Sequence, residues 1–208
     1  MPTHARAGFY GRVIVPWLTH VAMQNQEIRR RRAEIVPAAR GRVLEIGIGS
    51  GLNLPYYRDI GMVVGIDPSP RLLARAKKAA AATGLDVELI EGSAEDLPMP
   101  EESFDTVLTT CTLCTIPNAA KALAEMRRVL RPSGQLLFLE HGLSPDPRVR
   151  TWQDRLNPLW RRLAGGCNLN RPIDRLIAGA GFHIDVLTNE YARGPRPMTY
   201  LYRGAAKA

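Results

Sequence analysis

Residues 42–51, with the sequence R-V-L-E-I-G-I-G-S-G, decide the fold. Val43, Leu44 and Ile46 form a short apolar run of the kind that makes a buried parallel strand. Glycines follow at positions 47, 49 and 51. Because glycine carries no Cβ, the N–H groups of such a loop can approach a bound molecule closely. The stretch therefore predicts a strand that ends in a ligand-binding loop formed around Gly47, Gly49 and Gly51.

The spacing of these glycines limits the kinds of ligand that the loop can bind. A dinucleotide-binding loop has the pattern G-x-G-x-x-G, but here the third glycine comes one residue early and Leu52 follows it. Glu45 stands two positions before the first glycine, where a carboxylate would repel a pyrophosphate and would suit an ammonium group. The pattern E-x-G-x-G-x-G resembles the first motif of class I S-adenosylmethionine-dependent methyltransferases. This resemblance implies S-adenosylmethionine as cofactor and S-adenosylhomocysteine as product.

Composition and charge limit the possible domain count, location and binding partners. The 208 residues, of which 45% are hydrophobic and 23% charged, suit a single α/β domain. The net charge of +8 favours an acidic partner, such as anionic lipid headgroups or nucleic acid, or a solvated basic surface. Three cysteines and no signal peptide indicate a reducing, cytoplasmic location. No apolar run approaches the roughly 20 residues that span a bilayer.

Residues 1–40 are expected to form a helical N-terminal cap. Apolar residues recur there at roughly helical spacing, interrupted by Pro16. Four consecutive arginines at 29–32 would point in four directions around a helix. This favours a solvated helix with Glu27–Arg31 and Arg30–Glu34 pairs. Peripheral contact of this basic segment with membrane headgroups remains the alternative.

Two further positions complete the predicted cofactor site at the second strand. A helix is expected to open at Asn53, with its first N–H groups facing a carboxylate of the ligand. The second strand, 62–66, ends at Asp67 and Pro68, twenty positions after Gly47. A carboxylate at this place accepts both hydroxyls of a ribose in nucleoside-binding α/β folds. Asp67 could also cap the next helix, expected over 69–82, and the two roles are compatible.

The third, fourth and fifth strands are expected at 87–90, 104–108 and 135–139, with a helix over 118–130. Thr110 and Cys111 follow the fourth strand at the carboxyl edge of the sheet, where ligands bind. Cys111 and Cys114 have C-x-x-C spacing, but no second pair completes a zinc site, so no metal is expected. His141 ends the fifth strand at the same edge. It is either a general base or substrate contact, or a structural imidazole.

The resemblance to class I methyltransferases covers residues 42–142, including R-V-L-R-P-S-G at 128–134. It implies a Rossmann-like sheet of seven strands, mostly parallel with one antiparallel strand, and helices on both faces. The antiparallel strand would come from a hairpin of strands at 182–187 and 198–203. The resemblance also places Ser93, Ala94 and Glu95 along the adenine edge.

The single domain, 1–208, is expected to have four parts: the cap 1–40, the cofactor-binding core 41–142, an acceptor-site insertion 143–180 and the hairpin 181–208. The insertion has an apolar stripe at helical spacing, typical of a core-facing helix, and then G-G-C-N-L-N-R at 165–171. The stripe consists of Trp152, Leu156, Leu159, Trp160 and Leu163.

The E-H pair at 140–141, the tryptophan-containing helix and G-C-N-L-N-R resemble the methyltransferase-like proteins that include microsomal alkyl-thiol S-methyltransferases. Animal members of that group begin with a hydrophobic anchor that is missing here. This resemblance implies an acceptor site roofed by the cap and the insertion. Its candidate walls are Tyr10, Trp17, His20, Trp152, Trp160 and Asn168.

The leading functional hypothesis is methyl transfer to a small lipophilic acceptor, with a thiol favoured. A thiol with a pKa near ~8.5 already supplies a few per cent of thiolate, so it demands less of a base. The second hypothesis is methylation of a phospholipid amine or a quinone at a membrane surface. The third is a nonenzymatic protein that binds S-adenosylmethionine or nucleic acid, although no nucleic-acid motif supports it. The sequence does not indicate an oligomeric state.

Overall fold

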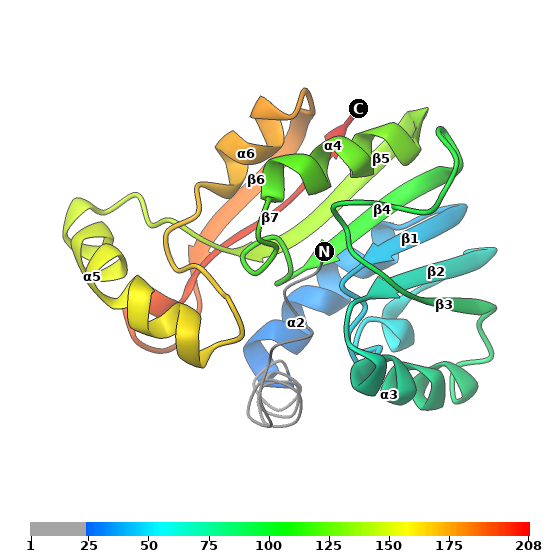
Figure 1. The fold of residues 1–208 in the computed structure, drawn as a ribbon, viewed down its shortest axis with the longest axis horizontal. Helices are drawn as coiled ribbons and strands as arrows, with labels where there is room; N and C mark the ends of the chain where they lie inside the picture. Colours follow the sequence, from blue (N-terminus) through cyan, green and yellow to red (C-terminus); the bar gives the residue numbers. More distant parts are fainter. Residues whose placement is uncertain (1–23) are drawn as a thin grey trace.

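The computed structural model describes residues 24–208 (Figure 1). Tyr10, Trp17 and His20, three of the candidate acceptor residues, lie outside these described residues. So does most of the expected N-terminal cap. Within residues 24–208, no helix combines the length and apolar character needed to span a membrane.

A seven-stranded sheet forms the centre of the molecule, in the order β3-β2-β1-β4-β5-β7-β6. The first five strands in this order run parallel, and β7 runs antiparallel to both β5 and β6. The expected mostly parallel sheet with one inserted antiparallel strand is confirmed. The strands are β1 Arg42–Ile46, β2 Met62–Asp67, β3 Val87–Glu91, β4 Phe104–Thr110, β5 Leu130–His141, β6 His183–Tyr191 and β7 Tyr200–Lys207.

Helices cover both faces of the sheet, as expected (Figure 1). On one face α2 and α3 pack against apolar side chains such as Val43 and Leu137, and on the other α4 and α6 pack against side chains such as Leu44 and Phe138. The helices are α2 Gln26–Ile35, α3 Pro70–Ala81, α4 Ala119–Val129, α5 Pro147–Leu163 and α6 Ile173–Gly179. Short 3-10 turns, η3 Val36–Ala38, η4 Leu54–Tyr56 and η5 Arg196–Met198, lie between them.

The helix expected to open at Asn53 is wrong. Only the single turn η4 forms there, and Tyr57 is already extended, with a ψ of 141°. Asp59 then adopts a left-handed conformation, with a φ of 49°, and β2 begins three residues later. The short connection between the glycine loop and β2 leaves no length for a helix, so no helix N-terminus faces the ligand edge at this place.

The apolar stripe of α5 also departs from the expectation of a core-facing helix. Trp152, Leu159 and Leu163 are 55%, 59% and 52% exposed, respectively. The buried residues of α5 are Val149 and Gln153. Helix α5 lies to one side of the sheet instead of across a face of it (Figure 1). The core is therefore formed by the other helices, and the apolar stripe is largely a surface feature.

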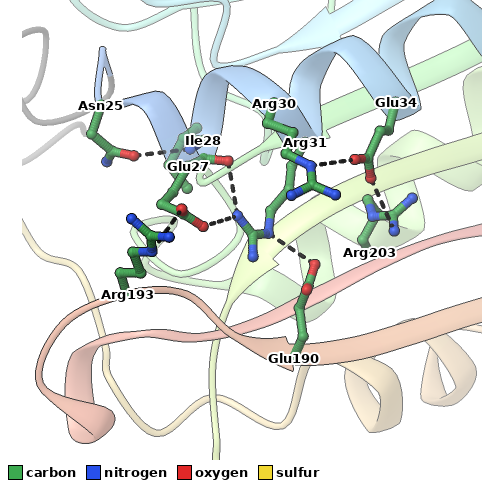
Figure 2. A network of polar contacts seen from close by, with 9 residues as sticks. All are labelled: Asn25, Glu27, Ile28, Arg30, Arg31, Glu34, Glu190, Arg193 and Arg203. Atoms are coloured by element: carbon green, nitrogen blue, oxygen red, sulfur yellow. Dashed lines mark hydrogen bonds and ion pairs between the residues drawn. The ribbon is translucent and has the colours of Figure 1, made fainter.

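Ion pairs fix α2 to the far edge of the sheet (Figure 2). Arg31 pairs with Glu27 at 2.8 Å and with Glu190 of β6 at 2.9 Å. Glu34 pairs with Arg30 at 3.2 Å and with Arg203 of β7 at 3.2 Å. The expected pairs within α2 are confirmed. The four successive arginines do not form one patch, since Arg31 and its neighbour Arg32 are buried whereas Arg29 and Arg30 are exposed.

Candidate active site

The glycine loop is held against β2 by its first two amides. The N–H groups of Gly47 and Ile48 both donate to the carbonyl of Ile66, at 2.8 and 3.2 Å. A Cβ at Gly47 would lie 2.4 Å from the side chain of Thr112, whereas a Cβ at Gly49 would meet only a carbonyl at 3.8 Å. The absent Cβ at position 47 therefore makes room for Thr112, and position 49 is the open side of the loop.

Asp67 joins the glycine loop to the start of α3. One carboxylate oxygen accepts the Gly49 N–H at 3.0 Å, and the other accepts the Ser69 N–H at 2.8 Å. Ser69 in turn caps α3 by accepting the Leu72 N–H. A carboxylate oxygen has more than one lone pair, so these contacts leave capacity for hydroxyl donors. Pro68, which follows, is exposed.

Glu45 lies beneath the loop and is fully enclosed. Its oxygens accept hydrogen bonds from the Asn53 amide at 2.9 Å and the Tyr57 hydroxyl at 2.7 Å. Burial raises the pKa of Glu45 to about 7, and these two donors oppose the shift. The Asn53 amide also donates to the Thr110 hydroxyl at 2.9 Å. The structure thus brings together three predicted site residues from β1, the loop and β4.

The remaining polar atom of Asn53 has no partner. Its Oδ1 is buried and makes no hydrogen bond with any of the described residues. A buried acceptor of this kind costs free energy unless a donor reaches it. An ammonium group entering at the loop would supply such a donor.

Arg32 is a site residue that the sequence analysis missed. It is buried on α2, and its guanidinium acts electrostatically on Glu45, Cys111 and Tyr56. Burial lowers the pKa of Arg32. One sequence signal could have found it, because Arg32 lies in the same helical phase as the apolar Ile28 and Ile35.

Arg32 also lines a hollow of about 420 Å³ between α2, the glycine loop and α3. This hollow is rich in positive charge, and no carboxylate is among the described residues that line it. The residues are Gln24, Arg29, Arg32, Ser50, Gly51, Leu52, Pro55, Tyr56, Arg75, Lys78 and Ala79.

The loop after β3 is tied to the start of α4. The Ser93 hydroxyl accepts the Glu95 N–H at 3.2 Å, and the Glu95 carboxylate accepts the Asn118 N–H at 2.9 Å. Ala94 is buried between them, whereas Ser93 is exposed. These hydrogen bonds of Ser93 and Glu95 fix the shape of the loop.

His141 lies at the carboxyl end of β5, as expected, and is buried. Its Nδ1 lies 4.0 Å from the sulfur of Cys167. Its Nε2 is buried with no hydrogen-bond partner within residues 24–208. A structural imidazole would normally have both nitrogens satisfied. Nε2 is therefore a buried polar atom whose hydrogen-bonding capacity a ligand could satisfy.

Glu140, the neighbour of His141, has a structural role. It is buried and accepts hydrogen bonds from the Thr109 hydroxyl at 2.7 Å and the Thr112 N–H at 3.0 Å. Burial raises the pKa of Glu140 to about 7. The carboxyl thus fixes the loop that follows β4 and contains Cys111 and Cys114.

Cys167 is the second site residue that the sequence analysis missed. A hydrogen bond from Cys114, with a further contribution from His141, lowers the pKa of Cys167 to about 5. Burial raises the pKa of Cys111 to about 12. Of these two thiols, Cys167 is the more acidic. Within the described part of the chain, no group of three or more His, Cys, Asp or Glu side chains could hold a metal ion.

The three candidate acceptor residues of the insertion, Trp152, Trp160 and Asn168, differ in how close they lie to the candidate site. Asn168 is buried and donates to the carbonyls of Cys114 and Gly166, at 2.9 and 3.0 Å, so it locks the two loops together. The indole N–H of Trp160 is buried, and Trp160 lies close enough to Cys167 to lower the pKa of that thiol. Trp152 lies on the outer surface, with the Arg155 guanidinium 5.7 Å from its ring. It does not line an enclosed site.

Comparison with known proteins gives consistent results. Residues 44–138 match the family described as methyltransferase domain. The phosphatidylethanolamine N-methyltransferase of Cereibacter sphaeroides is 41% identical over 115 residues, which are 54% of this chain and 57% of that protein. The human thiol S-methyltransferase TMT1B is 30% identical over 189 residues, which are 85% of this chain and 76% of that protein. The chain thus spans little more than half of the bacterial relative.

The fold has close counterparts among solved structures. A SAM-dependent methyltransferase from Leishmania major superimposes with a TM-score of 0.70, over 95% of this chain and 80% of that chain. The two sequences are 18% identical, so this likeness concerns the fold alone.

Proposed function

Because the chain belongs to the class I S-adenosylmethionine-dependent methyltransferases, we propose that it moves a methyl group from S-adenosylmethionine to a small lipophilic thiol. The thiol is favoured by the human relative, which is named a thiol S-methyltransferase and aligns over most of this chain. The observation that carries the proposal is the buried, unpartnered Nε2 of His141 at the carboxyl end of β5.

The residues around the glycine loop fit S-adenosylmethionine. Gly49 provides the open side of the loop, and Asp67 would accept the ribose hydroxyls. The unpartnered Oδ1 of Asn53 would accept an N–H of the amino group, and Arg32 would face the carboxylate. When bound, this cofactor supplies a methyl group made electrophilic by its sulfonium.

On the acceptor side, His141 is proposed to hold the proton of the thiol. A thiol delivered to the end of β5 would donate its proton to Nε2, which leaves the sulfur as a thiolate nucleophile. The sulfur of Cys167 lies 4.0 Å from Nδ1, so Nε2 is the ring nitrogen that we propose for contact with the acceptor. Correct positioning supplies much of the remaining rate, because well-oriented reactants reach effective molarities of about 10⁵–10⁸ M.

A phospholipid amine is the second candidate acceptor. It is supported by the 41% identity to a phosphatidylethanolamine N-methyltransferase over about half of the chain. An amine is mostly protonated at neutral pH, so this reaction would place a heavier demand on a base than a thiol does. The unpartnered imidazole nitrogen agrees with either acceptor, and the choice depends on a direct comparison.

The test is an acceptor screen that measures release of S-adenosylhomocysteine from the purified protein. Alkyl and aryl thiols, phenols, primary amines and phosphatidylethanolamine in mixed micelles are compared at equal concentration. The proposal expects the highest kcat/KM with a lipophilic alkyl thiol. Faster turnover of phosphatidylethanolamine would show that the preferred acceptor is the phospholipid amine and not a thiol. Cofactor binding without turnover of any acceptor would point to a nonenzymatic binding protein.

A further inference from the structure

Helix α5 has an exposed apolar face that packing within the described chain does not explain. Trp152, Leu159 and Leu163 are 55%, 59% and 52% exposed. Their spacing of seven and then four residues places all three along one line of the helix. The buried residues Val149 and Gln153 lie on a different side. Among the described residues, the other large exposed hydrophobic side chains are on β6.

A row of arginines runs beside this apolar line. Arg148, Arg155 and Arg162 follow one another at intervals of seven residues, so they share one flank of the helix. None of the three forms an ion pair with a residue in 24–208. The guanidinium of Arg155 lies over the ring of Trp152, so the basic and apolar rows are in contact.

The one acidic residue of α5 faces away from the apolar line. Asp154 lies two positions after Trp152, about 160° further around the helix, and accepts a hydrogen bond from Asn170. The helix therefore has an exposed apolar line, a flank with three positive charges and no negative charge on that side. This arrangement is the one that favours helices lying in the interface of an anionic membrane.

We propose that α5 docks on an anionic lipid surface. Trp152, Leu159 and Leu163 enter the boundary between headgroups and acyl chains, and Arg148, Arg155 and Arg162 contact lipid phosphates. Helix α5 lies to one side of the sheet (Figure 1), and the side chains of Trp152, Leu159 and Leu163 are each more than half exposed. The proposal does not depend on which acceptor is methylated. A protein partner would need its own row of carboxylates to match the arginines, whereas an anionic bilayer supplies negative charge at every position.

Trp160, on the same helix, links this surface to the candidate active site. Its side chain is half-buried and lies near Cys167, whereas its neighbour Leu159 is exposed on the docking face. A lipophilic acceptor dissolved in the bilayer would then reach the candidate site from the side of α5. Docking would raise the local concentration of such an acceptor without altering cofactor binding.

The experiment is sedimentation of the full chain with vesicles at physiological salt. One set of vesicles is pure phosphatidylcholine, and the other contains about 30% phosphatidylglycerol. The native chain is expected to bind the anionic set and not the neutral set. Replacement of the three arginines by glutamine should lower the partition coefficient about 100-fold. Replacement of Trp152, Leu159 and Leu163 by serine should lower it by at least about 10-fold.

Matched variants separate docking from general effects. Arg71→Gln, Lys77→Gln and Lys121→Gln together remove three exposed charges elsewhere, and Val186→Ser with Leu187→Ser removes exposed apolar surface on β6. Both controls should keep native vesicle binding, and circular dichroism should show that all variants remain folded. Equal losses in the controls and the α5 variants would overturn the proposal. So would an absence of vesicle binding combined with dimerisation that the serine variant abolishes.

Discussion

Asp67 and Glu45 are both carboxylates beside the glycine loop, but their hydrogen-bond partners give them different roles. Asp67 accepts two backbone N–H groups and connects the loop to α3. Glu45 is enclosed, and its partners are the side chains of Asn53 and Tyr57. Asp67 is therefore the carboxylate that can meet a ribose, whereas Glu45 fixes the orientation of Asn53.

Replacement of Asp67 by alanine should weaken S-adenosylmethionine binding. The loss of a charge-assisted hydrogen bond worth roughly 1.5–3 kcal/mol corresponds to an increase in Kd of about 10- to 100-fold. Isothermal titration calorimetry measures this change. Asp86→Ala, an exposed position next to β3, is the control and should keep native affinity. Unchanged affinity in Asp67→Ala would remove the ribose assignment.

Glu45 makes folding stability depend on pH. Its pKa is about 7 in the folded protein and is near its ordinary value of 4.5 once the chain unfolds. Because the folded pKa is raised, the contribution of Glu45 is fully present below about pH 4.5 and is lost as the pH rises through about 7. Glu45→Gln cannot ionise and should keep its stability over this range.

The difference in free energy of unfolding, native minus Glu45→Gln, should therefore shrink by roughly 2–3 kcal/mol between about pH 5 and pH 8. Urea denaturation at a series of pH values measures it. The comparison isolates Glu45 from Glu140, whose pKa is also raised to about 7 and which is present in both proteins. A difference that stays constant with pH would show that Glu45 does not change its protonation on folding.

His141→Gln should lower turnover and leave cofactor affinity unchanged. Loss of general-base assistance typically costs a factor of about 10²–10⁴ in rate. The loss should be largest for alkyl thiols and smallest for acidic aryl thiols, which are already ionised at neutral pH. Steady-state kinetics over such a thiol series measures this trend. His183→Gln, an exposed position on β6, should behave as native. An equal loss for all thiols would argue against proton transfer at His141.

At the scale of secondary structure, α2 depends on its connections to the sheet. Arg31 joins the helix to β6 through Glu190, and Glu34 joins it to β7 through Arg203 (Figure 2). Few side chains of this basic helix are apolar, although Ile28 and Ile35 are buried. The ion pairs therefore determine where α2, and with it Arg32, lies relative to the glycine loop.

Arg31→Leu should lower the free energy of unfolding by about 1–2 kcal/mol. Breaking a fully buried ion pair costs about 3–5 kcal/mol, but the side chains of Glu27 and Glu190 remain 32% and 39% exposed and can be hydrated. Urea denaturation measures the loss, and Arg30→Leu, on the solvent side of the same helix, is the control. The cofactor affinity of Arg31→Leu should also fall, because Arg32 loses its fixed position. Native stability in Arg31→Leu would show that the apolar contacts of α2 suffice.

The sequence predicted those helices and strands that are determined by a local pattern of apolar and capping residues. The first four strands and the helices α3 and α4 were placed to within two residues, because apolar runs and capping residues mark them, whereas β5 begins five residues earlier than expected and β6 and β7 each end four residues later. It did not predict the single turn η4 or the exposed stripe of α5. Both depend on tertiary structure: on the length of chain between the glycine loop and β2, and on which helices pack against the sheet. Arg32 and Cys167 were missed for the same reason: which arginine points inward and which thiol meets His141 are set by tertiary packing.

At the scale of the whole molecule, the sheet order brings the candidate site together. The carboxyl ends of β1, β2, β4 and β5 lie at one edge of the sheet, because these strands are parallel. Asp67, Thr110 and His141 stand at three of these ends, and the glycine loop follows the fourth. This part of the site was predictable from strand order alone.

Bound S-adenosylmethionine should stabilise the domain as one unit. The proposed contacts come from α2, β1, β2 and the loop after β1, which are distributed over the molecule. At a free concentration of 100 times Kd, the cofactor should raise the free energy of unfolding by about 2.7 kcal/mol. Thermal unfolding should show one transition that moves upward with cofactor concentration. A second transition that does not move would indicate a separately unfolding part. Asp67→Ala serves as the control, with little upward shift.

Strand β7, Tyr200–Lys207, lies between β5 and β6, although it is the last strand along the chain. During synthesis, β6 leaves the ribosome before β7, which is the strand that it pairs with. The β6–β7 pairing is complete only after residue 207 has left the ribosome. A chain that stops before residue 200 would present both β5 and β6 as unpaired edges, which promote aggregation. The position of β7 between β5 and β6 therefore makes completion of the sheet depend on the last residues to be synthesised.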